Sequence, residues 1–143
     1  MDVLTPEQRR RCMSAIRSKH TKPELAVRFL LRRLGQHYKL HAKNLPGKPD
    51  LVIPLTRKAI FVHGCFWHMH RCHYGKVVPA TNVAFWRKKR RSNVNRDRQK
   101  RRALRKQGWK VYTVWECWTR KPAILLERIA AILNADLPET ADE

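Results

Sequence analysis

The chain has 143 residues, with 32 Lys or Arg against 11 Asp or Glu and a formal net charge of +21. This length suits one domain whose core needs no disulfides, and no apolar run approaches the roughly 20 residues of a membrane span. Five tryptophans and 43% apolar residues favour a folded protein over a basic tail. The composition therefore predicts a polyanionic partner, nucleic acid rather than an acidic membrane surface.

The first elements in chain order are helices. Thr5 to Gln8 carries capping-box residues with a proline at the first helical position, which predicts a helix over about 5–18. A second helix is predicted over 22–34, because apolar residues recur at helical spacing from Val27 to Leu34 and Gly35 supplies a stop.

The middle and C-terminal parts predict a small sheet with further helices. Apolar runs bounded by turn residues indicate strands at 50–53, 59–63 and 109–115. The basic segment 82–107 is predicted to be helical, and so is the apolar-faced segment 122–133.

Residues 1–135 are therefore expected to form one domain of the α/β (α+β) class, with helices outside a small mixed sheet. The end, 136–143, holds four acids and no core pattern, and we expect it to be loose. No charged and then apolar leader opens the sequence, so we expect a cytoplasmic, nucleoid-associated protein whose four cysteines are thiols or metal ligands.

The stretch 63-HGCFWHMHRCH-73 gathers two cysteines and four histidines. Thiolates and imidazoles suit tetrahedral zinc, and Cys117 offers a further thiolate. The alternative is that the cysteines are small buried thiols and the histidines are surface groups near phosphate. A histidine not needed by zinc could act as a general acid or base.

Phe66 and Trp67 stand among these polar groups. They could pack on the sheet, or they could enter the stack of a deformed duplex, as apolar wedges do in proteins that bend DNA.

Only two carboxylates, Asp50 and Asp97, occur between Leu25 and Trp115. Nucleases use carboxylates to hold Mg²⁺ against the scissile phosphate. The Pro-Asp pair before a strand matches the start of the PD-(D/E)xK nuclease pattern, but the second strand carries 61-FVH-63 where an acid and a lysine are expected. Structural alternatives are a turn hydrogen bond for Asp50 and an ion pair within its helix for Asp97.

Helical spacing places Trp86, Lys89, Asn93 and Asp97 on one stripe of the basic segment. Such a stripe could face nucleic acid, with an aromatic to stack and an amide to bind a base edge, or it could cover the sheet.

Taken together, 45-LPGKPDLVI-53, 61-FVHGCFWH-68, His70 with Cys72, 85-FW-86, 93-NVNRD-97 and 114-VWEC-117 resemble the very short patch repair endonucleases. The resemblance runs from about Thr5 to Leu133. It implies a restriction-endonuclease-like core, one structural zinc ion and catalytic Mg²⁺, two ions being expected. It also implies a nick on the 5′ side of the thymine in a T:G mismatch, which arises by deamination of 5-methylcytosine.

The resemblance also implies roles for individual residues. Asp50 and the backbone carbonyl of Val62 would bind Mg²⁺, His68 and Asp97 would form the catalytic pair, and Glu24 would be an outer acid near the metal. The zinc ligands would be Cys65, His70, Cys72 and Cys117.

For DNA, the resemblance implies a wedge beside the mismatch, with the first helix probing from the minor groove and the basic helix carrying candidates for reading the mismatch. These residues are Phe66, Trp67 and Trp86 for the wedge, Met13 and Ile16 for the first helix, and Lys89 and Asn93 for reading. The expected partners are double-stranded DNA with a T:G mismatch and downstream repair proteins, and we expect a monomer. No role follows for His63, Met69, His73 or Cys12.

Two other functions fit parts of the sequence. A zinc-stabilised nucleic-acid-binding module without activity would account for the charge. A restriction-type nuclease that cuts both strands at intact sites would account for the carboxylates, but not for the wedge aromatics.

Overall fold

The computed structural model describes residues 21–135, so the predicted helix at 5–18, with Cys12, Met13 and Ile16, and the acidic end 136–143 lie outside the described residues. The elements are α2 (Lys22–Arg33), β1 (Lys39–Leu40), β2 (Leu51–Ile53), the 3-10 turn η1 (Pro54–Thr56), β3 (Lys58–His63), α3 (Val83–Lys106), β4 (Lys110–Trp115), α4 (Glu116–Thr119) and α5 (Pro122–Asn134).

The four strands form one mixed sheet in the order β1-β2-β3-β4. β1 with β2 and β2 with β3 are antiparallel, whereas β3 and β4 are parallel, with Ala59 opposite Val111. The long helix α3 makes the crossover that a parallel pair requires. The predicted mixed sheet with flanking helices is confirmed. The restriction-endonuclease-like core stays a prediction.

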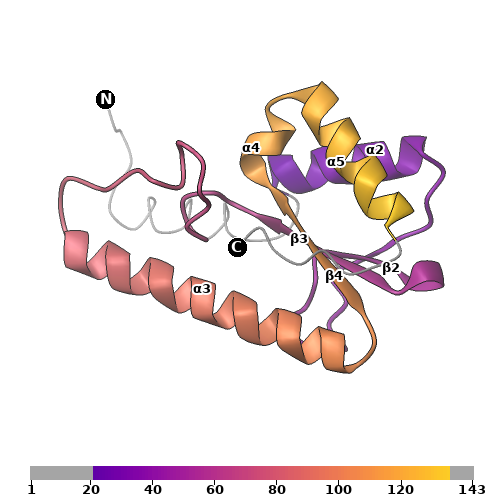
Figure 1. Ribbon diagram of the computed structural model, residues 1–143, viewed down its shortest axis with the longest axis horizontal. Coiled ribbons are helices and arrows are strands. Elements are labelled where there is room, and N and C mark those ends of the chain that lie inside the picture. Colours follow the sequence, from indigo (N-terminus) through magenta and orange to yellow (C-terminus); the bar gives the residue numbers. More distant parts are fainter. Residues whose placement is uncertain (1–20, 136–143) are drawn as a thin grey trace.

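Helices cover both faces of the sheet (Figure 1): α3 lies along one face, and α2, α4 and α5 pack together on the other. Side chains alternate accordingly. Leu51, Ile53 and Ile60 join the core under α2 and α5, whereas Val52 and Ala59 join the smaller cluster under α3. Within residues 21–135, no helix is long and apolar enough to cross a bilayer.

The predicted start and stop of α2 are confirmed. The hydroxyl of Thr21 accepts a hydrogen bond from the backbone N–H of Glu24 at 3.3 Å. At the other end, Gly35 has φ +72°, and the N–H of Gln36 bonds the carbonyl of Leu31 at 2.9 Å. This is the glycine-terminated helix end expected of a Schellman motif.

The strand directions bring four chain segments together at one edge of the sheet, meaning the side where the strands begin or end and not an outermost strand. Leu40 pairs with Leu51, so the end of β1 lies beside the start of β2, where Asp50 stands. Because β2 runs antiparallel to β3, that edge also receives His63 at the end of β3, and the parallel β4 ends there as well. Residues 41, 50, 63 and 117 therefore gather there although they are far apart in sequence.

A buried lysine fastens α5 to the sheet. Lys58, 2% exposed, donates from Nζ to the carbonyls of Ile132 and Leu133 at 2.8 and 2.7 Å. Both carbonyls belong to the last turn of α5, where regular helical partners run out, and that of Ile132 also accepts from the N–H of Ala135 at 3.3 Å.

Replacing Lys58 with Met should therefore lower the free energy of unfolding by about 2–4 kcal/mol, because hydrogen bonds from a charged donor would be lost and two carbonyls left without it. Urea denaturation measures the change. The exposed Lys121→Met is the matched control, and an equal loss in both variants would contradict this role.

Candidate functional site

Three groups of metal-ligating or titratable side chains lie at the shared sheet edge and in the loop after β3. They are His63, His68 and Asp97; Glu24, His41 and Asp50; and Cys65, His70, Cys72 and Cys117. Within each group the ligand atoms lie within 4.8 Å of one another. All four acids and histidines predicted for catalysis therefore fall into two neighbouring groups.

His68 and Asp97 are joined directly. His68 Nδ1 lies 2.6 Å from Asp97 Oδ2, and the carboxylate is buried in the face of α3 that meets the sheet. An ionised carboxylate accepts a proton donor, so Nδ1 carries the hydrogen and Nε2 is the nitrogen left for proton transfer. The side chain of His68 is 23% exposed, which leaves the ring accessible at the surface.

His63 joins this pair, and the sequence analysis gave it no role. Its ring stacks on that of His68 with centroids 3.8 Å apart, and its Nε2 lies 3.9 Å from Asp97 Oδ1. Burial, together with the charges of His68, Arg101 and Lys100, holds the pKa of His63 well below its usual value, so the ring is neutral near pH 7. The alternation of side chains along β3 could have predicted this position, because His63 faces the same side of the sheet as Ala59 and Phe61, the side that α3 covers.

Glu24, His41 and Asp50 form the second group. Glu24 is 2% exposed, and its carboxylate binds His41 Nε2 at 2.9 Å and Arg28 at 3.4 Å. Glu24 lies close to Asp50, and its predicted role as an outer acid near a metal stays a prediction. His41 was not anticipated in this group.

The carboxylate of Asp50 is held against β3. Its Oδ2 accepts a 2.7 Å hydrogen bond from the N–H of Val62. Burial raises the pKa of Asp50 to about 6, and the negative charge of Glu24 adds to the rise, while the Val62 N–H and the nearby His41 and His68 oppose it. In a strand, N–H and C=O of one residue point to the same side, so the carbonyl of Val62 also faces Asp50.

The third group has the spacing of a tetrahedral metal site. Cys117 Sγ lies 3.6 Å from His70 Nδ1, and the N–H of Cys117 lies 3.3 Å from Cys65 Sγ. Zinc bonds of about 2.3 Å to sulfur and 2.0–2.1 Å to nitrogen put tetrahedral S and N ligands about 3.5 Å apart. The donor set and its spacing therefore fit zinc.

Burial raises the thiol pKa values of Cys65 and Cys117. For Cys72, burial is outweighed by the backbone N–H groups of Gly75 and Tyr74 and by hydrogen bonds with the other two thiols, so its pKa lies below the usual value. Two of the three thiols are therefore costly to ionise without a cation, and such thiols are the kind that a bound metal deprotonates.

The predicted wedge aromatics form one cluster over the start of α3. The rings of Phe66 and Trp67 lie 5.1 Å apart, Trp67 and Trp86 lie 5.4 Å apart, and Phe85, 58% exposed, extends the cluster beside Trp86. Phe66, Trp67 and Trp86 are only partly buried, so they are not core residues of the sheet.

Arg90 fastens the loop that carries these aromatics. It is 6% exposed, and its guanidinium donates to the carbonyls of Phe66, Gly75 and Val77 while lying 4.4 Å from the Phe66 ring centroid. A Cβ on Gly75 would overlap the backbone of His70, so only glycine fits where the loop crosses itself.

The stripe of α3 divides its residues between the loop and the surface. Asn93 Nδ2 donates to the carbonyl of Trp67 at 3.0 Å, and its Oδ1 accepts from Arg96 at 2.6 Å. Lys89 and Trp86 are half-buried. Asn93 therefore supports the loop that carries Phe66 and Trp67. Reading of a mismatch by Lys89 and Asn93 stays a prediction.

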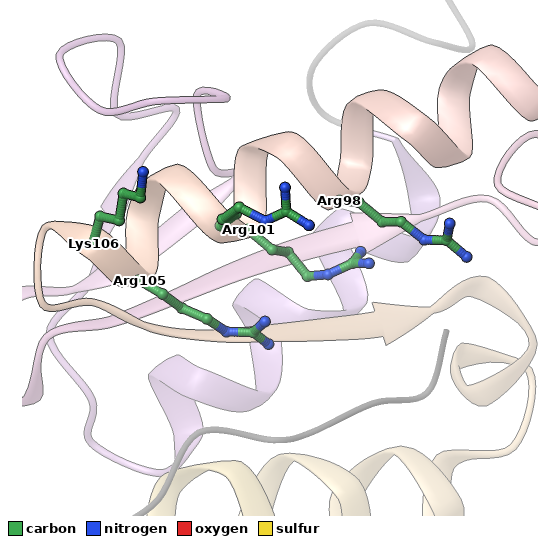
Figure 2. A pocket seen from close by; sticks show the side chains of 5 residues that line it. Arg98, Arg101, Arg105 and Lys106 are labelled. Carbon is green, nitrogen blue, oxygen red and sulfur yellow. The ribbon is translucent and has the colours of Figure 1, made fainter.

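The other sides of α3 are basic along its length. One groove of about 430 Å³ is lined by Arg98, Arg101, Arg102, Arg105 and Lys106. Figure 2 shows Arg98, Arg101 and Arg105 following one another along one side of the helix. A second groove, of about 580 Å³, includes Arg87, Lys88, Arg91 and Arg96. At about 1.5 Å per residue, α3 is roughly 36 Å long, close to one turn of B-DNA.

Known proteins resemble this chain along most of its length. A family model described as DNA mismatch endonuclease Vsr matches residues 1–74. The type II nicking enzyme V.XorIIP of Xanthomonas oryzae pv. oryzae is 45% identical over 133 residues, 93% of this chain and 97% of the relative. The type II nicking enzyme V.NmeAIP of Neisseria meningitidis is 41% identical over 133 residues, 93% and 94% of the two chains. The DNA mismatch endonuclease Vsr of Escherichia coli is 42% identical over 119 residues, 83% and 76%.

The raised pKa of Asp50 predicts how the free energy of unfolding changes with pH. Between about pH 4 and 6 the folded state retains a proton that the unfolded state has lost, so ionised Asp50 costs stability above pH 6. Asp50→Asn should therefore raise the free energy of unfolding of the protein without divalent cations at pH 7.5, by about 1–3 kcal/mol. The gain should vanish below about pH 4.

Denaturant titrations across pH 3.5–8 measure this difference, with the exposed Glu127→Gln as control. A gain that does not change with pH, or a loss at pH 7.5, would contradict the burial of an ionisable Asp50.

Proposed function

The chain belongs to the Vsr family of DNA mismatch endonucleases, and from that premise we propose that it nicks duplex DNA on the 5′ side of the thymine in a T:G mismatch by Mg²⁺-dependent hydrolysis. The observation that carries the proposal is the His68–Asp97 hydrogen bond beside the carboxylates of Asp50 and Glu24. The charge of His68 is the smallest of the causes that act on the pKa of Asp50, which still places the two groups within electrostatic reach of one another.

His68 transfers the proton in this proposal. Asp97 holds Nδ1 and stabilises the charged ring, so Nε2 takes a proton from the attacking water or gives one to the leaving oxygen. The stacked, neutral ring of His63 limits the rotation of His68 and excludes water from Asp97.

Asp50 would hold the catalytic Mg²⁺, with the carbonyl of Val62 as a further ligand and Glu24 beside them. A buried and a half-buried carboxylate, next to a half-buried imidazole and a backbone carbonyl, suit a hard divalent cation. Such a cation supplies polarisation of the phosphoryl group and activation of water.

The group of Cys65, His70, Cys72 and Cys117 would hold one structural zinc ion. Its part is to tie the loop after β3 to the end of β4, because Cys117 follows β4 and the other three lie in the loop. Zinc thereby fixes the backbone on both sides of His68, which keeps the histidine pointed at Asp97.

Phe66, Trp67 and Trp86 would enter the base stack beside the mismatch. Stacking aromatics gain little from a perfect duplex, whereas a T:G pair costs less to unstack, so the wedge favours the lesion. Met13 and Ile16 would act from the minor groove, and the arginines of α3 would hold phosphates.

Nicking assays test the proposal directly. A labelled duplex with one T:G pair should be nicked with Mg²⁺ present, and neither its T:A twin nor a sample with EDTA should be. His68→Ala and Asp97→Asn should each lower the single-turnover rate by about 10²–10⁴, because general acid–base transfer is lost, while the Kd for the T:G duplex changes little.

His73→Ala, an exposed histidine in the same loop, is the matched control and should nick at the wild-type rate. Equal nicking of both duplexes, cutting of both strands, or full activity in His68→Ala would each sink the proposed reaction.

Salt dependence tests the α3 surface separately. Replacing the exposed residues Arg98, Arg102 and Lys106 with Ala should reduce the slope of log K against log salt by up to about 2.7, since each phosphate contact contributes about 0.9. Discrimination between T:G and T:A duplexes should not change, because phosphate contacts carry no sequence information.

Arg32, Arg33 and Lys121, on the elements across the sheet, give a control variant with the same loss of charge. If both triple variants reduced the slope equally, only net charge would matter and α3 would not be the DNA-binding surface.

A further inference from the structure

His41 stands where the chain turns from β1 toward Asp50. Its φ is +47°, a left-handed conformation that few residues other than glycine adopt. Its N–H donates to the carbonyl of Asp50 at 2.9 Å, so the backbone of the two residues is tied at the sheet edge. This conformation brings the imidazole beside the first turn of α2, where Glu24 lies.

The imidazole is placed among the carboxylates. Nε2 lies 2.9 Å from Glu24 Oε1, and one donor atom from each of His41, Glu24 and Asp50 falls within a 4.8 Å limit. Glu24 also forms an ion pair with Arg28, at 3.4 Å, so His41 is not its only partner.

We propose that His41 is a nitrogen ligand, and Glu24 a direct oxygen ligand rather than an outer acid, of the divalent cation held by Asp50, which makes this a mixed nitrogen–oxygen metal site. The inference rests on the proposed function insofar as the ion is the one used for cleavage. Two ligands at right angles on an octahedral ion, each at 2.0–2.1 Å, lie about 3 Å apart. The separation of His41 Nε2 and Glu24 Oε1 equals that spacing.

A nitrogen ligand changes which metal the site prefers. Oxygen-only sites suit Mg²⁺, whereas imidazole favours first-row transition ions over Mg²⁺. The site therefore takes Mn²⁺ more tightly than Mg²⁺, and His41 widens the difference beyond what the carboxylates alone would give.

Mn²⁺ binding to the full-length, zinc-loaded protein without DNA tests the assignment. Pulsed EPR of bound Mn²⁺ should show coupling to a histidine nitrogen in the wild type, with the pattern changing on ¹⁵N-histidine labelling. In His41→Gln the coupling should disappear, and Mn²⁺ affinity should fall at least about tenfold while Mg²⁺ affinity falls less. His37→Gln, an exposed histidine on the neighbouring turn, is the matched control and should behave as wild type.

Absence of nitrogen coupling in the wild type overturns the proposal without any variant. Nitrogen coupling that persists in His41→Gln, or an Mn²⁺ affinity that is equal in His41→Gln and the wild type, also overturns the proposal and leaves His41 as a partner of Glu24 only. Zinc content verifies that the variant is folded, and His41→Asn replaces it if zinc is lost. Nicking of T:G duplex is measured separately, so a nitrogen-coupled Mn²⁺ site in a protein that does not nick T:G would contradict the proposed function and not the ligand.

Discussion

The site depends on how the loop after β3 is held against α3. That loop carries Phe66, Trp67 and His68, and its backbone makes local turn hydrogen bonds, with the N–H of His68 donating to Gly64 and that of His70 to Cys65. Side chains of α3 tie this loop to the helix: Arg90 binds the carbonyl of Phe66, Asn93 that of Trp67, and Asp97 the ring of His68. Three successive loop residues are therefore fixed by residues at helical spacing, and α3 sets the position of the two aromatics and the histidine together.

The buried polar groups show why a protein of charge +21 keeps acids at all. Asp97 and Asp50 both point inward, at the His63–His68 pair and at Val62, while the arginines of α3 line its outer grooves. Under the proposed function, a phosphate of the DNA backbone would be drawn by these arginines toward the carboxylates, and a bound cation would offset the repulsion between phosphate and carboxylates. Binding and chemistry would then fall to different faces of one helix.

Much of this was predictable, and the misses have physical causes. The long elements were predicted within a residue or two because helical spacing and apolar runs are local signals. β1 and α4 were missed because two and four residues carry no periodicity. Cys117 and Asp97 were candidates from the residues alone, but their partners, the zinc group and His68, came only from the family resemblance. The pairing of β3 with β4 places Cys117 there and the packing of α3 places Asp97 there, and neither contact is visible in the sequence. His63 and His41 were missed because their roles depend on strand parity and on a left-handed turn.

A crystal structure with a T:G duplex and Mn²⁺, recorded at the manganese and zinc absorption edges, tests the account most directly. It should place zinc among Cys65, His70, Cys72 and Cys117, manganese beside Asp50, and the phosphate 5′ of the mismatched thymine between manganese and His68. Manganese bound by His63, His68 and Asp97, or a phosphate out of reach of His68, would contradict the assignment of these residues to cleavage.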